Sequence, residues 1–279
     1  MHLAPRGQPD TLTAHFEFPN RTFAGPAVIS VDEVNLGKQL SRLHLTLWQG
    51  GLMSKPPWVD QSASRRTVLA YTTHADLRNF TGISLPTGYE GREAAALPTL
   101  PDFEALKASG RDGSWEEPKI PESSPWPRAS WTCGYASPAG EPITKDTLAY
   151  VVDSFPYNMH TFLAAPELRQ LLLSQPDPDG ETKEKKAQRA EVKERDEQRA
   201  GLWFPTVVMN LEAKTALPVE GVEWLAVRVT SKQIKDGKFD MEVIVRDVEG
   251  EMVALSHHVA MIVSLERNTK KRGSSKASL

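Results

Sequence analysis

An internal repeat limits the folds that this chain can adopt, because two distant parts of it follow the same order of patterns. Residues 11–18 alternate apolar and polar side chains and begin one series of strand-like runs, and residues 206–213 begin a second. Each series closes on a further β-rich run, at 67–74 in the first and 253–263 in the second. Repetition of a mostly antiparallel unit predicts two similar domains packed as a pseudo-dimer, with a ligand site at their junction.

The composition limits the classes of function that the chain can have. At 279 residues it is long enough for two domains, each with its own core. The net charge of −3 provides no overall attraction to nucleic acid or to an anionic membrane. The single cysteine, Cys133, excludes an intrachain disulfide and a cysteine-rich zinc site. No apolar run has the length of a membrane span, and no metal-binding cluster or phosphate-binding glycine loop is present, so we predict no cofactor and no metal.

These features predict a cytoplasmic protein. The last residues, Ser275–Leu279, depart from a peroxisomal signal because serine stands where a basic residue is needed.

Changes in composition predict the domain boundaries. We expect an N-terminal unit at 1–80, a proline-rich linker at 81–128, a C-terminal unit at 129–268 and a flexible tail at 269–279. The C-terminal unit contains a charged insertion at 176–200. Its acids nearly balance its bases and it has no apolar face, so it indicates neither a core element nor a nucleic-acid site.

A single helix is predicted at the start of the second unit. Leu148, Val151, Val152 and Phe155 recur at helical spacing, and Pro156 ends or kinks the helix. The strands that follow can bury this apolar stripe only if their sheet curls round the helix. The pattern therefore predicts an α+β fold in which an antiparallel sheet wraps a helix.

The second unit resembles the C-terminal half of double-hotdog acyl-CoA thioesterases of the acyl-CoA thioesterase II type. Four segments carry the resemblance in the same order, at 143–156, 203–208, 223–227 and 252–260. The first unit resembles the N-terminal hotdog of fungal members through residues 11–18 and 43–49. The resemblance implies a tandem, or double, hotdog.

The first unit departs from that family in one respect. Its long strand begins by about residue 11, so we expect the first hotdog to lack its N-terminal helix. Apolar sheet surface would then need another cover.

The resemblance also implies a catalytic set. Family members use an aspartate, a threonine and a glutamine to hold and polarise a water that attacks the thioester carbonyl. By position these correspond to Asp153, Thr206 and His258, so that histidine replaces glutamine. A carboxylate accepts the proton of the water, a hydroxyl fixes its orientation, and an imidazole accepts or donates according to its tautomer.

Other side chains are candidates for substrate binding. In a regular strand Asn210 shares a face with Thr206, so it could orient a substrate. His257 and His258 are adjacent and point to opposite faces, so only one of them can enter a given site. His257 is therefore the second candidate for substrate binding, after Asn210. His15 and His44 are interpreted as structural or surface residues.

The leading hypothesis is a thioesterase that hydrolyses an acyl-CoA, or a carrier-bound acyl group, to a free acid and a thiol. The alternative is a non-catalytic hotdog that binds an acyl chain or serves in assembly, which the histidine at 258 and the missing helix favour. A third hypothesis is a dehydratase or cyclising enzyme of fungal secondary metabolism. The expected partners are an acyl-CoA or acyl-carrier substrate and a second copy of the double hotdog, with no nucleic acid and no membrane span.

Overall fold

The computed structural model describes residues 3, 6–97, 99–108, 129–137, 140–154 and 202–264. The predicted insertion at 176–200 and tail at 269–279, together with much of the predicted linker, lie outside these residues. The first part of the chain forms strands β1 (Asp10–Glu17), β2 (Val28–Leu36), β3 (Ser41–Gln49) and β4 (Arg65–Ala75), a 3-10 turn (Leu77–Asn79) and helix α1 (Phe103–Ala108). The second part forms β5 (Ala129–Tyr135), α2 (Leu148–Asp153), β6 (Leu202–Trp203), β7 (Thr206–Ala213), β8 (Leu225–Ser231), β9 (Ile234–Lys235), β10 (Lys238–Arg246), β11 (Met252–Met261) and β12 (Val263–Ser264).

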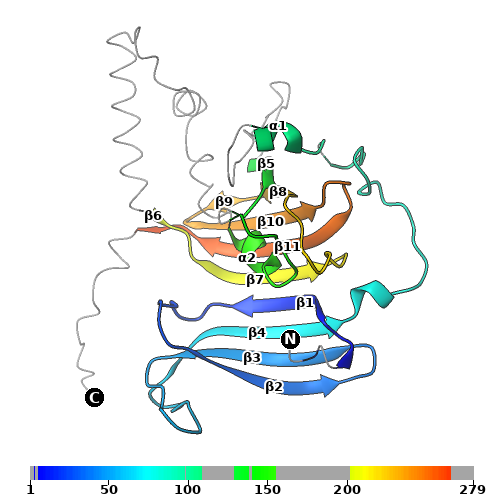
Figure 1. The fold of residues 1–279 in the computed structure, drawn as a ribbon. Helices are drawn as coiled ribbons and strands as arrows, with labels where there is room; N and C mark the ends of the chain where they lie inside the picture. Colours follow the sequence, from blue (N-terminus) through cyan, green and yellow to red (C-terminus); the bar gives the residue numbers. More distant parts are fainter. Residues whose placement is uncertain are drawn as a thin grey trace, which may run out of the picture.

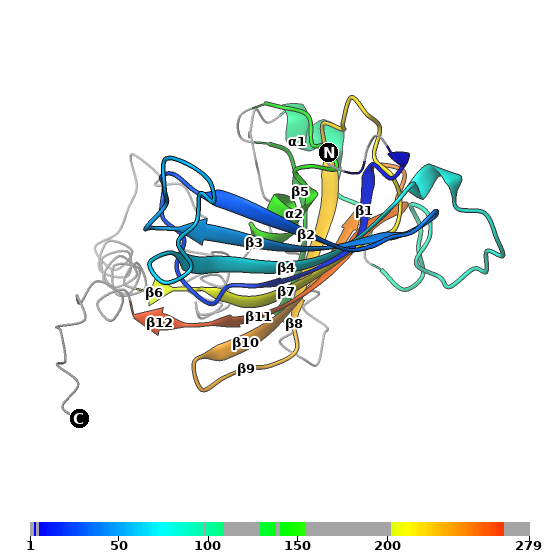
Figure 2. The same ribbon diagram turned by 90° about the horizontal axis from the view of Figure 1, so that it is seen from below.

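The two repeats join into one continuous antiparallel sheet. Its strand order is β2-β3-β4-β1-β7-β11-β10-β8-β5, and the halves meet where β1 pairs with β7 (Figure 1). Viewed from below, the strands of both halves follow one another across a single twisted surface (Figure 2). The order is symmetric about the junction, because β1, β4, β3 and β2 correspond to β7, β11, β10 and β8. This arrangement confirms the double-hotdog expectation.

The repeat extends to the register of the strands. The pairing of β1 with β4 slips between Thr11 and Thr13, and the pairing of β7 with β11 slips between Thr206 and Val208. These two slips occupy the same place in the aligned repeats, one residue after the threonine that opens each segment. Each half therefore carries the same β-bulge, in which one strand contains an extra residue that is left unpaired.

Helix α2 covers one face of the second half of the sheet (Figure 1). Its apolar residues Leu148, Val151 and Val152 are buried, as their spacing predicted. They belong to a core cluster that includes Met209 and Leu211 of β7. Burial of an aliphatic side chain of this size stabilises the fold by about 1.5–3 kcal/mol, so the packing of α2 on the sheet fixes the position of the residue at its end, Asp153.

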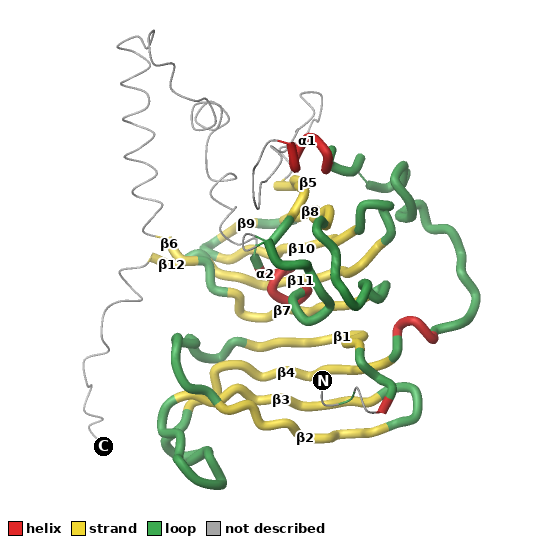
Figure 3. Tube along the Cα trace, viewed as in Figure 1, coloured by secondary structure: helices red, strands yellow, loops and turns green. Residues whose placement is uncertain are grey.

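The corresponding face of the first half carries apolar residues but no helix among the described residues (Figure 3). On this face Val31 lies opposite Leu45 and Ile29 lies opposite Leu47. Ile29 is 60% exposed and Val31 is 39% exposed. The described part of the chain therefore leaves apolar sheet surface uncovered, as expected for a first hotdog without its helix.

A buried carboxylate ties the two halves together beside the junction. Asp10 is only 3% exposed and forms ion pairs with Lys145 at 3.3 Å and with Arg78 at 3.9 Å. Lys145 also donates to the carbonyl of Pro9 at 2.9 Å, and Arg78 donates to the carbonyl of Leu217 at 2.6 Å. These contacts connect β1, the turn after β4, the segment before α2 and the loop after β7.

Candidate functional site

Asp153, Thr206 and His258 converge on one point of the structure. Asp153 is the last residue of α2, Thr206 is the first residue of β7, and His258 lies in β11. The hydroxyl of Thr206 donates to Oδ1 of Asp153 at 2.9 Å, and Nδ1 of His258 lies 3.5 Å from the same oxygen. The three side chains chosen from the resemblance therefore form one cluster, while the role of each in catalysis stays a prediction.

The β-bulge in β7 accounts for the orientation of Thr206. Met209 lies opposite His258 and so shares its face of the sheet, the face that α2 covers. In a regular strand Thr206, three residues before Met209, would point to the other face. The unpaired residue between Thr206 and Val208 reverses the alternation, so the hydroxyl of Thr206 reaches Asp153.

Hydrogen bonds determine which ring nitrogen of His258 carries a proton. The hydroxyl of Ser256 donates to the carbonyl oxygen of Asn210 at 2.7 Å, and it lies 2.8 Å from Nε2 of His258. A hydroxyl has one hydrogen and a carbonyl can only accept, so Ser256 must accept from an Nε2–H group. In the neutral ring, Nδ1 then carries a lone pair that faces Asp153.

This arrangement leaves one buried acceptor directed at the cluster. The side chain of His258 is 0% exposed, and its Nδ1 has no hydrogen-bond partner in the described part of the protein. Asp153 is the solvent-facing member, with 38% of its side chain exposed. Two acceptor atoms, Nδ1 of His258 and Oδ1 of Asp153, therefore lie side by side where water can reach one of them.

A pocket opens beside Asp153 at the junction of the two repeats. Its volume is about 310 Å³. The first half contributes the connection between β1 and β2, and the second half contributes the end of α2 and the segment that leads into β7. The lining residues are Phe18, Asn20, Arg21, Thr22, Asp153, Trp203, Phe204, Pro205 and Thr206.

Asn210 and His257 lie on the opposite face of the sheet from this pocket. Asn210 is paired with His257 on one side and with His15 on the other, and its Oδ1 lies 2.7 Å from Nδ1 of His15. The expectation that Asn210 shares a face with Thr206 is wrong, because the bulge changes the alternation between them. Only the backbone carbonyl of Asn210 is connected to the cluster, through Ser256.

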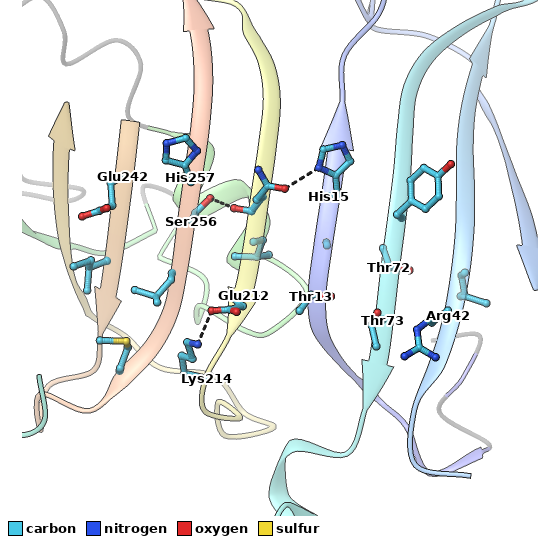
Figure 4. Close-up of a pocket in the computed structure, with 18 of the residues that line it drawn as sticks. Thr13, His15, Arg42, Thr72, Thr73, Glu212, Lys214, Glu242, Ser256 and His257 are labelled. Atoms are coloured by element: carbon cyan, nitrogen blue, oxygen red, sulfur yellow. Dashed lines mark hydrogen bonds and ion pairs between the residues drawn. The ribbon is translucent and has the colours of Figure 1, made fainter. Parts of the chain in front are cut away.

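The face with Asn210 and His257 has a larger cavity of about 960 Å³. Figure 4 shows His15 and His257 on this side of the sheet, with Arg42 and Glu242 further out. His44 and Tyr71 also line it, with ring centroids 3.7 Å apart. None of the three clustered side chains lines this cavity, so its size does not connect it to the chemistry of Asp153.

Two functional features were missed by reasoning from the sequence. Ser256 lies two residues before His258, and that spacing in a strand places both side chains on one face, so its contact could have been predicted. No pattern in the sequence around Arg21 indicates that it lines the pocket, because this position depends on contact between the two halves.

Within the described residues, no group of three or more histidine, cysteine, aspartate or glutamate side chains is arranged to hold a metal ion. No helix in the same part of the chain has the length and apolar character needed to cross a membrane.

Comparison with known proteins gives a consistent result. Residues 1–73 match the family model of the acyl-CoA thioesterase N-terminal domain, and residues 88–262 match that of the acyl-CoA thioesterase C-terminal domain. The chain is similar to the thioesterase-like protein TwmA of the fungus Talaromyces wortmannii, with 60% identity over 300 aligned positions that cover 100% of this chain and 84% of the relative.

Solved structures agree on the fold. Acyl-CoA thioesterase II TesB2 from Mycobacterium marinum superposes with a TM-score of 0.55 at 13% identity, over 91% of this chain and 81% of that chain. A hot dog protein of unknown function from Alicyclobacillus acidocaldarius gives a TM-score of 0.54 at 13% identity, over 91% and 79%. With both of its repeats matched to domain models, and the two halves joined in one hotdog sheet, the chain belongs to the acyl-CoA thioesterase family.

Proposed function

We propose that this protein hydrolyses acyl thioesters, with Asp153 as the general base for an attacking water. The observation that carries the proposal is that one atom, Oδ1 of Asp153, contacts both of the other side chains. It accepts a hydrogen bond from the hydroxyl of Thr206 at 2.9 Å and lies 3.5 Å from Nδ1 of His258. The hydrogen bond from Thr206 fixes the carboxylate, and the pocket at the junction gives a thioester access to it.

We infer a water that enters beside the partly exposed Asp153 and then also reaches Nδ1 of His258, which is buried and has no hydrogen-bond partner in the described residues. Such a water donates one hydrogen to Asp153 and the other to Nδ1 of His258, so a lone pair on its oxygen is free for the carbonyl carbon. As the C–O bond forms, the proton passes to Asp153. Collapse of the tetrahedral intermediate then breaks the C–S bond, and the leaving thiolate takes up the proton held by Asp153, which gives a free acid and a thiol and restores the carboxylate.

The histidine changes the family arrangement in a specific way. A glutamine side chain can donate and accept at the same end, whereas a neutral imidazole with its hydrogen on Nε2 can only accept at Nδ1. His258 is therefore suited to hold the water and not to donate to the substrate carbonyl. The substrate class that the family name implies is an acyl-CoA, with the acyl chain length left to experiment.

The test is thiol release from a panel of short- to long-chain acyl-CoAs. Asp153→Asn should lower kcat by about a hundredfold or more, which is the usual contribution of a general base, while acyl-CoA binding by calorimetry remains. Asp146→Asn is the matched control, since Asp146 is an exposed acid just before α2. Full turnover by Asp153→Asn would contradict the proposal.

The second candidate is a non-catalytic acyl-binding hotdog, and the presence of histidine at position 258 is the observation that favours it. In that case the wild-type protein would bind acyl-CoA but release no thiol from any member of the panel.

A further inference from the structure

Two exposed arginines lie at the end of the sheet where the Asp153 pocket opens. Arg21 belongs to the connection between β1 and β2, and Arg65 begins β4. Arg21 itself lines the pocket together with Asp153. We call these two side chains the arginine rim.

Aromatic rings hold the arginine rim in place. The guanidinium carbon of Arg21 lies 5.2 Å from the ring centroid of Phe23 and 5.7 Å from that of Trp203. The guanidinium carbon of Arg65 lies 5.7 Å from the centroid of the same Phe23 ring. Cation–π contacts of this kind orient a guanidinium group and leave its N–H donors available at the edge. Arg66 is not part of the rim, because it is paired with Trp48 and lies over that ring at 5.0 Å, on the opposite face from Arg65.

The connection that carries Arg21 has a defined conformation. Gln49, which is buried, accepts from the backbone N–H of Phe23 at 3.0 Å and donates to its carbonyl at 2.7 Å. The side chain of Asn20 donates to the carbonyl of Arg66 at 2.9 Å. A paired amide and a second anchor fix the loop on β3 and β4, so the position of Arg21 at the mouth of the pocket is built into the fold.

The charges of the arginine rim are not neutralised within the described residues. Ion pairs there involve other basic groups, and none joins Arg21 or Arg65 to an acid. Arg21 and Arg65 contact the same ring, so their like charges are held close together. Such a group repels itself and attracts an anion, and the planar fork of arginine matches the oxygens of a phosphate.

We propose that the arginine rim binds the phosphate of the pantetheine arm that carries the acyl thioester. This inference rests on the proposed function and adds a binding site to it. The thioester must reach Asp153 inside the pocket, and the arm must leave through its mouth, where Arg21 stands. Coenzyme A and carrier-bound phosphopantetheine both have a phosphate next to the pantetheine, so the rim would bind a thioester delivered by either one.

The test compares thioesters that differ only in phosphate. Arg21→Ala, Arg65→Ala and the double variant are assayed with an acyl-CoA and with the N-acetylcysteamine thioester of the same acid, which has no phosphate. Loss of a hydrogen bond to a charged group costs about 1.5–3 kcal/mol, so kcat/KM for the acyl-CoA should fall about tenfold or more relative to the thioester without phosphate. Equal changes for the two substrates in every variant would overturn the proposal.

Several controls separate charge from folding. Arg21→Lys keeps the charge but loses the planar fork, so it should recover only part of the loss. Arg42→Ala removes an arginine on the opposite face, so the ratio of kcat/KM for the acyl-CoA to kcat/KM for the thioester without phosphate should not change. If this ratio fell as much in Arg42→Ala as in the rim variants, the effect would come from general electrostatics and the assignment of the site would be wrong.

A third substrate distinguishes the sources of the phosphate. If the variants are equally impaired with the acyl-phosphopantetheine thioester and with acyl-CoA, the rim binds the phosphate next to pantetheine. Impairment with acyl-CoA alone would overturn that assignment and point to the nucleotide phosphates. Calorimetric binding of free coenzyme A is independent of turnover, so its loss in the double variant would support the rim even if no hydrolysis were found.

Discussion

Nε2 of His258 lies 2.8 Å from the hydroxyl oxygen of Ser256, which gives its own hydrogen to the carbonyl of Asn210. Ser256 thus acts on the reaction only through His258, as a positioning residue. Ser256→Ala removes the acceptor for Nε2–H, so the imidazole can adopt the other tautomer and present N–H toward Asp153. We expect kcat to fall about tenfold, in line with the loss of one buried hydrogen bond.

Nitrogen NMR of the histidine ring provides a readout that a purely structural role would not change. In the wild-type protein the His258 signals should indicate hydrogen on Nε2, and in Ser256→Ala they should shift toward the other tautomer. Ser256→Thr keeps the hydroxyl and should restore both the spectrum and the turnover. An unchanged spectrum in Ser256→Ala would show that Ser256 does not set the tautomer.

Replacement of His258 itself should separate its hydrogen bonds from its packing. In His258→Gln the amide can donate to Ser256 and present its oxygen toward the water, so kcat should stay within about tenfold of the wild type. In His258→Ala the acceptor is lost and a cavity forms in a site that is 0% exposed, so kcat should fall by about a hundredfold and stability by about 2–3 kcal/mol. Thiol release and urea unfolding measure the two effects, and equal activity of the two variants would contradict this role.

The buried carboxylate of Asp10 should matter for stability more than for turnover. Removing one partner of a buried ion pair leaves the other without compensation, although Lys145 and Arg78 retain access to water. We expect Asp10→Ala to lower the free energy of unfolding by about 2–3 kcal/mol, measured by urea denaturation. Glu212→Gln breaks an exposed ion pair with Lys214 and should change stability little. A similar small effect at Asp10 would mean that it does not tie the halves together.

Stability should depend on pH through His74. Burial lowers the pKa of this half-buried imidazole below its ordinary value of 6.5, because the charged ring loses hydration. The unfolded chain then binds the proton more readily, so the contribution to stability is present above pH 6.5 and is lost as the pH falls through the folded-state pKa. The free energy of unfolding of the wild type should fall between about pH 7 and pH 5, and that of His74→Gln should fall less. His257→Gln, at an exposed position, is the control.

The sequence predicted those parts of the fold that depend on local periodicity. The apolar stripe of α2 and the strands of both repeats follow from spacings of 3.6 and 2 residues. The sequence did not predict the face of the sheet on which Asn210 lies. Regular alternation assumes that every residue is paired, whereas the bulge after Thr206 depends on the pairing of β7 with β11. No local pattern contains that information.

The candidate site likewise has a part that could be predicted from the sequence and a part that could not. The resemblance identified Asp153, Thr206 and His258, which the structure brings together. The contact of Arg21 with Trp203 joins residues from different repeats, and only the folded chain brings them within 5.7 Å. The predicted domain boundaries and the substrate-binding roles of Asn210 and His257 stay predictions.

The strand order also has a consequence for self-association. In the described residues the outer edges of the 10-stranded sheet are β2 and β5. An open edge offers amide and carbonyl groups to a strand of another molecule, and acidic side chains there oppose such pairing. Strand β2 carries Asp32 and Glu33 and is exposed along most of its length. These two acids oppose the pairing of two copies of the protein through β2.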